Sequence, residues 1–240
     1  LVGNEVAVKL FSAVEKGDLE AVTQILKFAT ADDVNHRASY ENERTALVMA
    51  IILDNLAIAE AILTHPDVKP NLPNKYDVLP LMLATSRMTD LLLSHPKVWT
   101  DVKGVERSFR VACKEGKLEL VRVYLACGEL NINAHNEDGV TALMLAACYN
   151  FPLVVEALFN RPDLDVNMQT FDGYTTLTRA CCGAKELPHI VQLLLSHPKL
   201  NINLRQQNGS TALAYACVAG RKKSVALLLA NPTIDVNLPD

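Results

Sequence analysis

Histidines are the first residues in this chain that could do chemistry, because imidazole is a common metal ligand. Three of them, His65, His95 and His197, stand directly before a proline, where a helix is expected to end. The sequence is repetitive, as described below, and these histidines fall at equivalent positions of separate repeats. Such positions are about 10 Å apart or more, so the three side chains cannot converge on one metal ion. A polar group there complements the helix C-terminus, and we interpret all three as structural. The others show no ligand spacing: His36, His135 and His189.

Motifs for catalysis are missing from the sequence. It contains no Gly-x-Gly-x-x-Gly, Walker-type loop, nucleophile elbow or His-Glu-x-x-His. Carboxylates are plentiful, but no pair has a spacing that requires acid–base work. We therefore expect no catalytic residue, no metal, no cofactor and no enzymatic activity within these residues.

Five of the six cysteines follow a recurring alanine by one or two residues, and no Cys-x-x-Cys occurs. A free cysteine packs like a small apolar residue, so we expect inert thiols and a reducing compartment. Cys182 stands at a more exposed register and is the best candidate for a reactive thiol. The five are Cys113, Cys148, Cys181, Cys182 and Cys217.

Basic residues gather between residues 103 and 117, close to Trp99. Arg107, Arg110 and Lys114 are spaced by three and four residues, which places them on one stripe of a helix. A solvated helix face is one interpretation, and a site for an acidic partner or a phosphate is the other. In the second case a small molecule or phosphate would bind near Arg87, Trp99, Arg107 and Arg110.

Three stretches near the C-terminus share one pattern, and this pattern positions the residues above. Residues 133–146, 167–180 and 203–216 are offset by 34 and 36 residues, a period typical of stacked helical repeats. Their landmark, Leu-x-x-Ala, recurs along the chain and predicts about seven repeats in a single domain over residues 1–240. Its copies are Leu10/Ala13, Leu47/Ala50, Leu81/Ala84, Phe109/Ala112, Leu143/Ala146, Leu177/Ala180 and Leu213/Ala216.

Each repeat gives the same order of signals. A turn such as Asp-Gly precedes a threonine that can cap the first helix. A Gly, Asp or Asn break follows, and then a Leu-rich second helix that a proline ends. A short β-like segment closes the repeat at residues 165–167, 201–203 and 235–237. The capping threonines are Thr45, Thr141, Thr175 and Thr211.

This pattern resembles the ankyrin repeat, whose family sequence is Asp-x-x-Gly-x-Thr-Pro-Leu-His-x-Ala-Ala followed by a Gly-rich break. The resemblance covers essentially all 240 residues. It implies an all-α repeat solenoid of helix-turn-helix pairs joined by β-hairpin-like loops. The family proline is mostly alanine here, although Pro80 keeps it, and the family histidine is replaced by Met144, Thr178 and Ala214. Because that histidine braces the turn, we expect less rigidly fixed hairpins.

The third repeat is shorter than the others. Ten residues separate Leu81 from Leu91, whereas fourteen separate Leu213 from Leu227, so about one helical turn is missing. The turn that follows, residues 98–104, is also shortened and lacks Asp-Gly. We expect a change in curvature, or an opening between repeats three and four, at residues 85–108.

Composition limits the class of partner. The net charge is −4, and neither half of the chain is strongly charged, so we expect neither nucleic acid nor an acidic membrane as partner. The most apolar run, residues 46–53, is too short to span a bilayer. The chain begins at Leu1 and ends where another repeat would start, so we expect a fragment of a longer chain. We expect a monomeric, intracellular, cytoplasmic protein, or one in host cytoplasm if it is a secreted effector.

The resemblance also implies where a partner would bind. Ankyrin-type stacks present hairpin tips and first-helix faces along a concave surface. Aromatic residues are only 5% of the chain, yet several fall at these positions, where they are typical interface anchors. The candidate partner-binding residues are Tyr40, Glu41, Asn42, Arg44, Lys75, Tyr76, Arg87, Trp99, Glu137, Asp138, Tyr149, Phe171, Asp172, Tyr174, Gln207 and Asn208.

These observations favour a non-enzymatic module that binds another protein through this concave face. The alternative is the recognition domain of a larger enzyme, or of a bacterial or protist effector, whose catalytic part lies outside the chain. Flanking sequence would distinguish the two.

Overall fold

The structure, a computed structural model of the chain, describes residues 5–38, 43–74, 78–183 and 185–238. It divides into two compact units, an N-terminal unit, Leu1–Ser108, and a C-terminal unit, Phe109–Asp240. Within the described residues the fold is all-α, with isolated β-bridges instead of strands. The single domain over residues 1–240 and the number of seven repeats stay predictions.

The N-terminal unit contains paired helices and two short additions. Helix α1 packs on α2 and α4, α4 packs on α5 and α6, and α5 packs on α7. The additions are α3 and a 3₁₀ helix, η1. The bounds are α1 Glu5–Glu15, α2 Leu19–Leu26, α3 Ala31–Val34, α4 Ala46–Ile52, α5 Leu56–Leu63, α6 Pro80–Leu83, α7 Ser86–Ser94 and η1 Pro96–Asp101.

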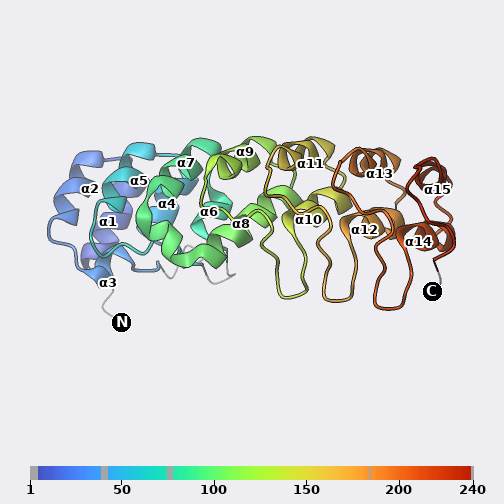
Figure 1. Cartoon of the computed structure of the whole chain (residues 1–240). Helices are drawn as coiled ribbons and strands as arrows, with labels where there is room; N and C mark the ends of the chain where they lie inside the picture. The colour runs from blue at the N-terminus through green and yellow to red at the C-terminus, as the bar shows by residue number, and fades with distance from the viewer. Residues whose placement is uncertain (1–4, 39–42, 75–77, 184, 239–240) are drawn as a thin grey trace. The chain divides into compact units, whose positions relative to one another are not determined.

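Helix α8, Val102–Lys114, contains the division between the units. In the C-terminal unit α10, α12 and α14 pack in one row, and α9, α11, α13 and α15 pack in a second. Three long loops project from the α10 row on the side away from the second row (Figure 1). The bounds are α9 Leu118–Ala126, α10 Ala142–Cys148, α11 Pro152–Phe159, α12 Thr176–Cys182, α13 Pro188–Leu195, α14 Ala212–Val218 and α15 Lys222–Leu229.

Threonine caps set the start of the first helices, as the sequence predicts. Thr45, Thr141, Thr175 and Thr211 have extended backbones, and each hydroxyl accepts a hydrogen bond from an amide three residues ahead. Each cap satisfies one of the amides that a helix leaves unpaired at its N-terminus. The predicted breaks are confirmed as well, because Asp54 and Asn150 adopt positive φ, as does glycine at the equivalent breaks after α1, α8 and α14.

Two local predictions were wrong. Residues 165–167, 201–203 and 235–237 form hydrogen-bonded turns, not β-like segments, because side-chain oxygens of Asp165, Asn201 and Asp235 accept from the amide two residues later. The expected turn at residues 98–104 is helical, formed by η1 and the start of α8. The shortened third repeat is confirmed, since α6 has 4 residues where α10 has 7.

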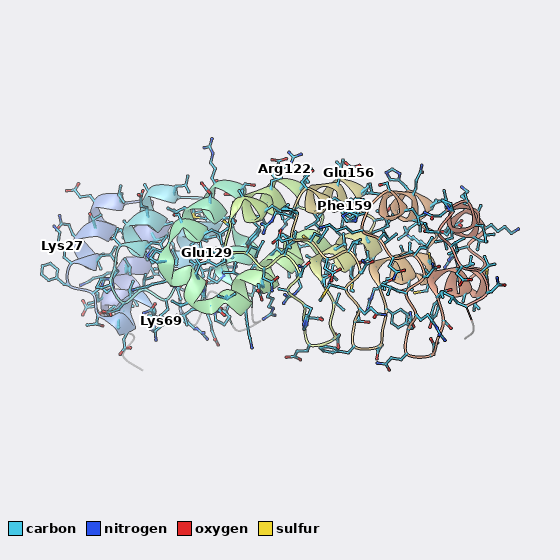
Figure 2. The ribbon with its side chains drawn as sticks, viewed as in Figure 1. Lys27, Lys69, Arg122, Glu129, Glu156 and Phe159 are labelled. Atoms are coloured by element: carbon cyan, nitrogen blue, oxygen red, sulfur yellow. The ribbon has the colours of Figure 1, made fainter. Side chains whose placement is uncertain are left out.

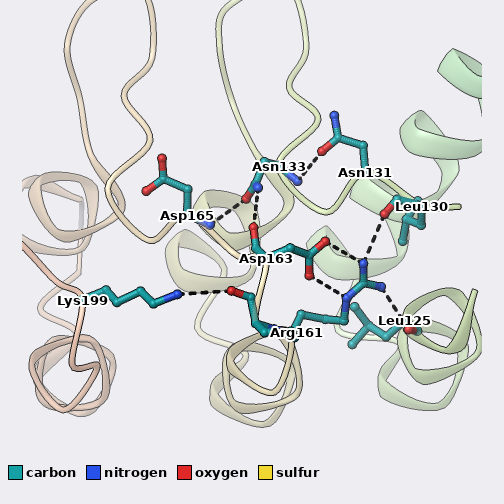
Figure 3. Close-up of polar contacts among 9 residues, drawn as sticks. Leu125, Leu130, Asn131, Asn133, Arg161, Asp163, Asp165 and Lys199 are labelled. Carbon is teal, nitrogen blue, oxygen red and sulfur yellow. Dashed lines mark hydrogen bonds and ion pairs between the residues drawn. The ribbon is translucent and has the colours of Figure 1, made fainter. Parts of the chain in front are cut away.

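Asparagine side chains join successive turns of the C-terminal unit. The Asn133 amide nitrogen donates to the carbonyl of Asp163 at 2.7 Å, and its oxygen accepts from the amide of Asp165 at 2.8 Å (Figure 3). Asn167 makes the same two bonds one repeat later, to Lys199 and Asn201, and Asn203 does so to Thr233 and Asp235. We call this series the asparagine ladder. Each member satisfies one donor and one acceptor of the neighbouring backbone.

The residues before proline brace the preceding helix, which confirms a structural role for two of the three histidines. The Nε2 atoms of His65 and His95 lie 3.1 Å from the carbonyls of Ala29 and Leu63. Arg161, at the same position, donates to the carbonyl of Leu125 at 3.1 Å (Figure 3). These groups satisfy carbonyls at or just beyond the ends of second helices.

His197 differs from this pattern. Its ring packs against Phe159, with 4.6 Å between ring centroids. Burial, together with the charge of Lys199, lowers the pKa of His197. The described residues contain no group of three potential metal ligands.

Candidate functional site

The predicted partner-binding residues fall in three groups. Those of the C-terminal unit lie on its loops and first-helix ends, as detailed below. In the N-terminal unit Arg87 is exposed on α7, and Trp99 is half-buried in η1 with its indole N–H donated to the carbonyl of Leu93 at 2.8 Å. Arg44 is half-buried, and its carbonyl accepts from Ala38 across a β-bridge. The others lie outside the described residues: Tyr40, Glu41, Asn42, Lys75 and Tyr76.

The three loops of the C-terminal unit are hairpin-like, as predicted. Isolated antiparallel bridges close two of them, His135 to Thr141 and Gln169 to Thr175. The exposed tips carry Glu137, Asp138, Phe171, Asp172, Gln207 and Asn208. We call the surface made by these tips and by the ends of α10, α12 and α14 the hairpin face.

Backbone contacts fix neighbouring tips to one another. The amide of Phe171 donates to the carbonyl of Asp138 at 3.1 Å, and the Gln207 side chain donates to the carbonyl of Phe171. The ring of Phe171 meets the ring of His135 edge-on, 5.6 Å between centroids, yet the side chain remains 60% exposed.

The loss of the family histidine is compensated in one repeat. The Thr178 hydroxyl accepts from the amide of Thr175 at 2.7 Å while Thr175 caps the helix, so the two threonines form a reciprocal capping box. This pair braces the start of α12. Met144 and Ala214 have no polar side-chain group that could do the same.

An aromatic and cationic stripe crosses the hairpin face at the level of the first helices. The ammonium of Lys114 lies 5.4 Å from the ring centre of Tyr149, which is 51% exposed. The guanidinium of Arg179 lies 5.7 Å from the ring centre of Tyr174, and Tyr174 in turn stands 5.7 Å from Tyr215. These are cation–π distances.

Polar groups hold the end of this stripe in place. The Tyr215 hydroxyl donates to Gln206 at 2.8 Å and accepts from the Asn208 amide at 3.0 Å. A hydrogen bond with Tyr215 raises the pKa of the Tyr174 hydroxyl. The two tyrosines therefore form a fixed aromatic wall that stays partly open to solvent.

Arg179 and Tyr215 were not among the predicted site residues. Both occupy the position directly before the landmark alanine, where Leu145 stands in the preceding repeat. The signal that could have found them is this register. The residue there is half-buried in all three repeats and varies from Leu to Arg to Tyr.

The register of Cys182 is more exposed than those of Cys113 and Cys181, but Cys217 is a better candidate for a reactive thiol. Cys182 is half-buried, and burial raises its pKa, although Arg179 and Arg221 partly offset this. Cys217 is the exposed cysteine among the six. Burial raises the pKa of Cys181 to about 12 and that of Cys113 further, so these two thiols remain protonated and unreactive near neutral pH.

A thiol-labelling experiment should show that the cysteines react in the order of their exposure. At pH 8 we expect Ellman's reagent to modify Cys217 first, Cys182 more slowly, and Cys113 and Cys181 only in denaturant. Mass spectrometry of peptides at successive times gives the rate for each residue. Cys217→Ser should remove the fastest phase, and modification of Cys182 before Cys217 would contradict the assignment.

A shallow hollow of about 470 Å³ lies on the other row of helices, between α9 and α11. Its lining includes Arg122 and Glu156, labelled in Figure 2, and Leu153, which is 60% exposed. No helix of the described residues is both long and apolar enough to cross a membrane.

Comparison with known proteins agrees with this geometry. Residues 153–240 match the family model of ankyrin repeats, with three copies. Among solved structures, the crystal structure of EF0377, an ankyrin repeat protein, matches with a TM-score of 0.51 and 22% identity. That match covers 92% of this chain and 96% of the other. No curated protein matches the chain significantly. Residues 153–240 therefore contain ankyrin repeats, and the ankyrin-repeat fold extends over most of the chain.

Proposed function

We propose that the C-terminal unit binds a segment of a partner protein across the hairpin face, without catalysis. Ankyrin repeats are generally protein–protein interaction modules and are typically non-catalytic. The observation that supports this proposal most directly is the exposure of Tyr149 and Phe171, 51% and 60%, on the same face as Tyr174 and Tyr215. Large aromatic side chains left in water are typical anchors of interfaces.

The arrangement on this face suits an interface with an apolar centre and a polar rim. The aromatic stripe lies along the first helices, and the tips beyond it carry charged or amide groups, such as Glu137, Asp172 and Asn208. The tips are fixed by hydrogen bonds between neighbouring hairpins. A partner would therefore lose little affinity to ordering of the loops.

A triple variant tests the face. Replacing Tyr149, Phe171 and Tyr174 together with alanine should weaken partner binding by about 100-fold, because each aromatic anchor contributes about 1 kcal/mol or more. The wild-type chain first isolates partners from a cell extract, and mass spectrometry identifies them. Affinities of the purified pairs are then measured by biolayer interferometry.

A matched control separates the two sides of the C-terminal unit. Leu153 and Leu229 are as exposed as the aromatic anchors, 60% and 52%, but lie on the second helices. The Leu153→Ala and Leu229→Ala double variant should bind normally. If this variant loses the partner and the aromatic variant keeps it, the row of second helices, where Leu153 lines the hollow between α9 and α11, contains the site instead. Circular dichroism melting curves confirm that each variant is folded.

A further inference from the structure

We propose that Arg179 and Arg221 form an anion site on the hairpin face, which binds a carboxylate side chain from an acidic segment of the partner. This inference rests on the proposed function and names the chemistry that the partner must carry. Both arginines are half-buried: Arg179 lies in the last turn of α12, and Arg221 is the residue directly before α15.

The positive charge of this pair has no ion-pair partner in the part of the chain that the structure describes. Neither guanidinium forms an ion pair with a carboxylate among the described residues. The Nε atoms of both side chains are buried and have no hydrogen-bond acceptor there. A buried donor left without an acceptor is costly, so a carboxylate that accepts from these guanidinium groups would favour binding.

Nearby carboxylates are committed elsewhere. Glu186 accepts from the amides of Lys223 and Ser224 at 2.7 and 3.1 Å, which places it at the start of α15. Asp172 lies on an exposed tip next to Tyr174. Within the described part of the chain, neither arginine is therefore ion-paired with a carboxylate, and Glu186 at the start of α15 is bound to backbone amides instead.

The two guanidinium groups act on the same place. The backbone carbonyl of Arg179 accepts from the Cys182 thiol at 3.9 Å and from the amide of Gly183, and the charges of both arginines lower the pKa of Cys182 against the larger effect of burial. Arg221 also donates to the carbonyl of Gly183, which follows α12. The C-terminal end of α12, at Cys182 and Gly183, is therefore contacted by Arg221 and lies within one turn of Arg179.

The surroundings favour a planar anion. The Tyr174 ring holds the Arg179 guanidinium from one side at 5.7 Å, and the neighbouring Cys148 thiol is only a weak acceptor. A guanidinium fixed in this way presents its N–H groups in a planar fork that matches a carboxylate. Tyr174 and Tyr215 would cover the apolar part of the glutamate or aspartate side chain.

The arginine side-chain signals in a ¹⁵N-correlated NMR spectrum of the full chain test this site directly. Hexaglutamate should shift the Nε–H signals of Arg179 and Arg221 in a saturable manner, and hexaglutamine should not. Arg122 provides the internal control, since it is exposed on α9 and already paired with Glu119 at 2.9 Å. Arg179→Lys and Arg221→Lys assign the two signals, because each removes one of them.

Binding measurements with variants complete the test. Arg179→Gln should weaken binding of hexaglutamate and of an isolated partner about tenfold, and Arg122→Gln should leave both unchanged. Arg179→Lys should bind more tightly than Arg179→Gln but more weakly than the wild-type chain, since lysine keeps the charge but lacks the planar pair of N–H donors of a guanidinium. Binding should also weaken as salt rises.

Other outcomes would overturn the inference. Equal shifts with hexaglutamine, equal shifts of Arg122, or full affinity of Arg179→Gln would each exclude a carboxylate site at this pair. A phosphoserine hexapeptide that shifts both signals where hexaglutamate does not would assign the site to phosphate. If the aromatic variant loses the partner while Arg179→Gln keeps it, the anion site fails and the proposed function stands.

Discussion

Replacing Gly173 with alanine should lower the free energy of unfolding of the C-terminal unit by about 3 kcal/mol, the sum of backbone strain and overpacking. Gly173 has φ of +84°, a conformation that is unfavourable for a residue with a Cβ. An added Cβ would also lie 2.9 Å from the amide nitrogen of Gln207 and 3.0 Å from Cα of Gln206. Both atoms belong to the backbone of the next hairpin, so they cannot move aside cheaply.

Gly220 is the matched control. Its φ is +66°, but an added Cβ would meet no atom within 4 Å. Gly220→Ala should therefore cost only about 1 kcal/mol, from backbone strain alone. Urea denaturation followed by circular dichroism compares the two variants. Equal losses would show that close contact between neighbouring hairpins contributes nothing to stability.

Removing one member of the asparagine ladder should also lower the free energy of unfolding of the C-terminal unit. Asn133→Ala deletes two hydrogen bonds, of 2.7 and 2.8 Å, and leaves the carbonyl of Asp163 and the amide of Asp165 without these partners (Figure 3). Each net hydrogen bond contributes about 1 kcal/mol, so we expect a loss of about 2 kcal/mol. Asn133→Asp keeps the acceptor for the amide of Asp165 but loses the donor to Asp163. Its free energy of unfolding should therefore lie between those of the wild-type chain and Asn133→Ala.

Asn237 stands at the same register and provides the control. It is exposed, and within the described residues its side chain makes no hydrogen bond to a following turn. Asn237→Ala should leave the urea midpoint unchanged. Hydrogen exchange of the Asp165 amide gives a local measure, since this amide should exchange faster in Asn133→Ala. Unchanged protection there would mean that water replaces the asparagine without cost.

Local signals predicted most of the helical framework because their physical basis is contained within a few residues. A threonine before an apolar run can cap a helix without help from distant residues, and Thr45 and Thr141 do so. Asp54 and Asn150 take the positive φ that such breaks require. The family pattern supplied the order of these signals.

Features that depend on neighbouring repeats were harder to predict. The Asp-Val-Asn sequence at residues 165–167 looks β-like, because a β-branched residue lies between polar ones. In the structure the asparagine side chain is used by the next turn, a contact 32 residues away. Residues 98–104 lack a turn signal, and there helix formation extends through η1 into α8.

The partner-binding role of the candidate residues stays a prediction. Tyr149 is exposed at the end of α10, Phe171 is exposed on a hairpin tip, and Tyr174 contacts Arg179. The register does not specify where long side chains extend, so the contact of Arg179 with Tyr174 could not be foreseen. Cys182 was misjudged for a related reason, because its burial depends on residues in neighbouring repeats.

The asparagine ladder also bears on how such a chain can change. Asn133, Asn167 and Asn203 bind only main-chain atoms of the following repeat, and every residue except proline offers the same amide and carbonyl. These hydrogen bonds are therefore independent of the side chains that the following repeat carries on its turn. A whole repeat of about 34 residues, the period of such stacks, could be duplicated, removed or exchanged for one with different tips. New binding specificity could arise by exchange of whole repeats, while the asparagine hydrogen bonds between repeats stay the same.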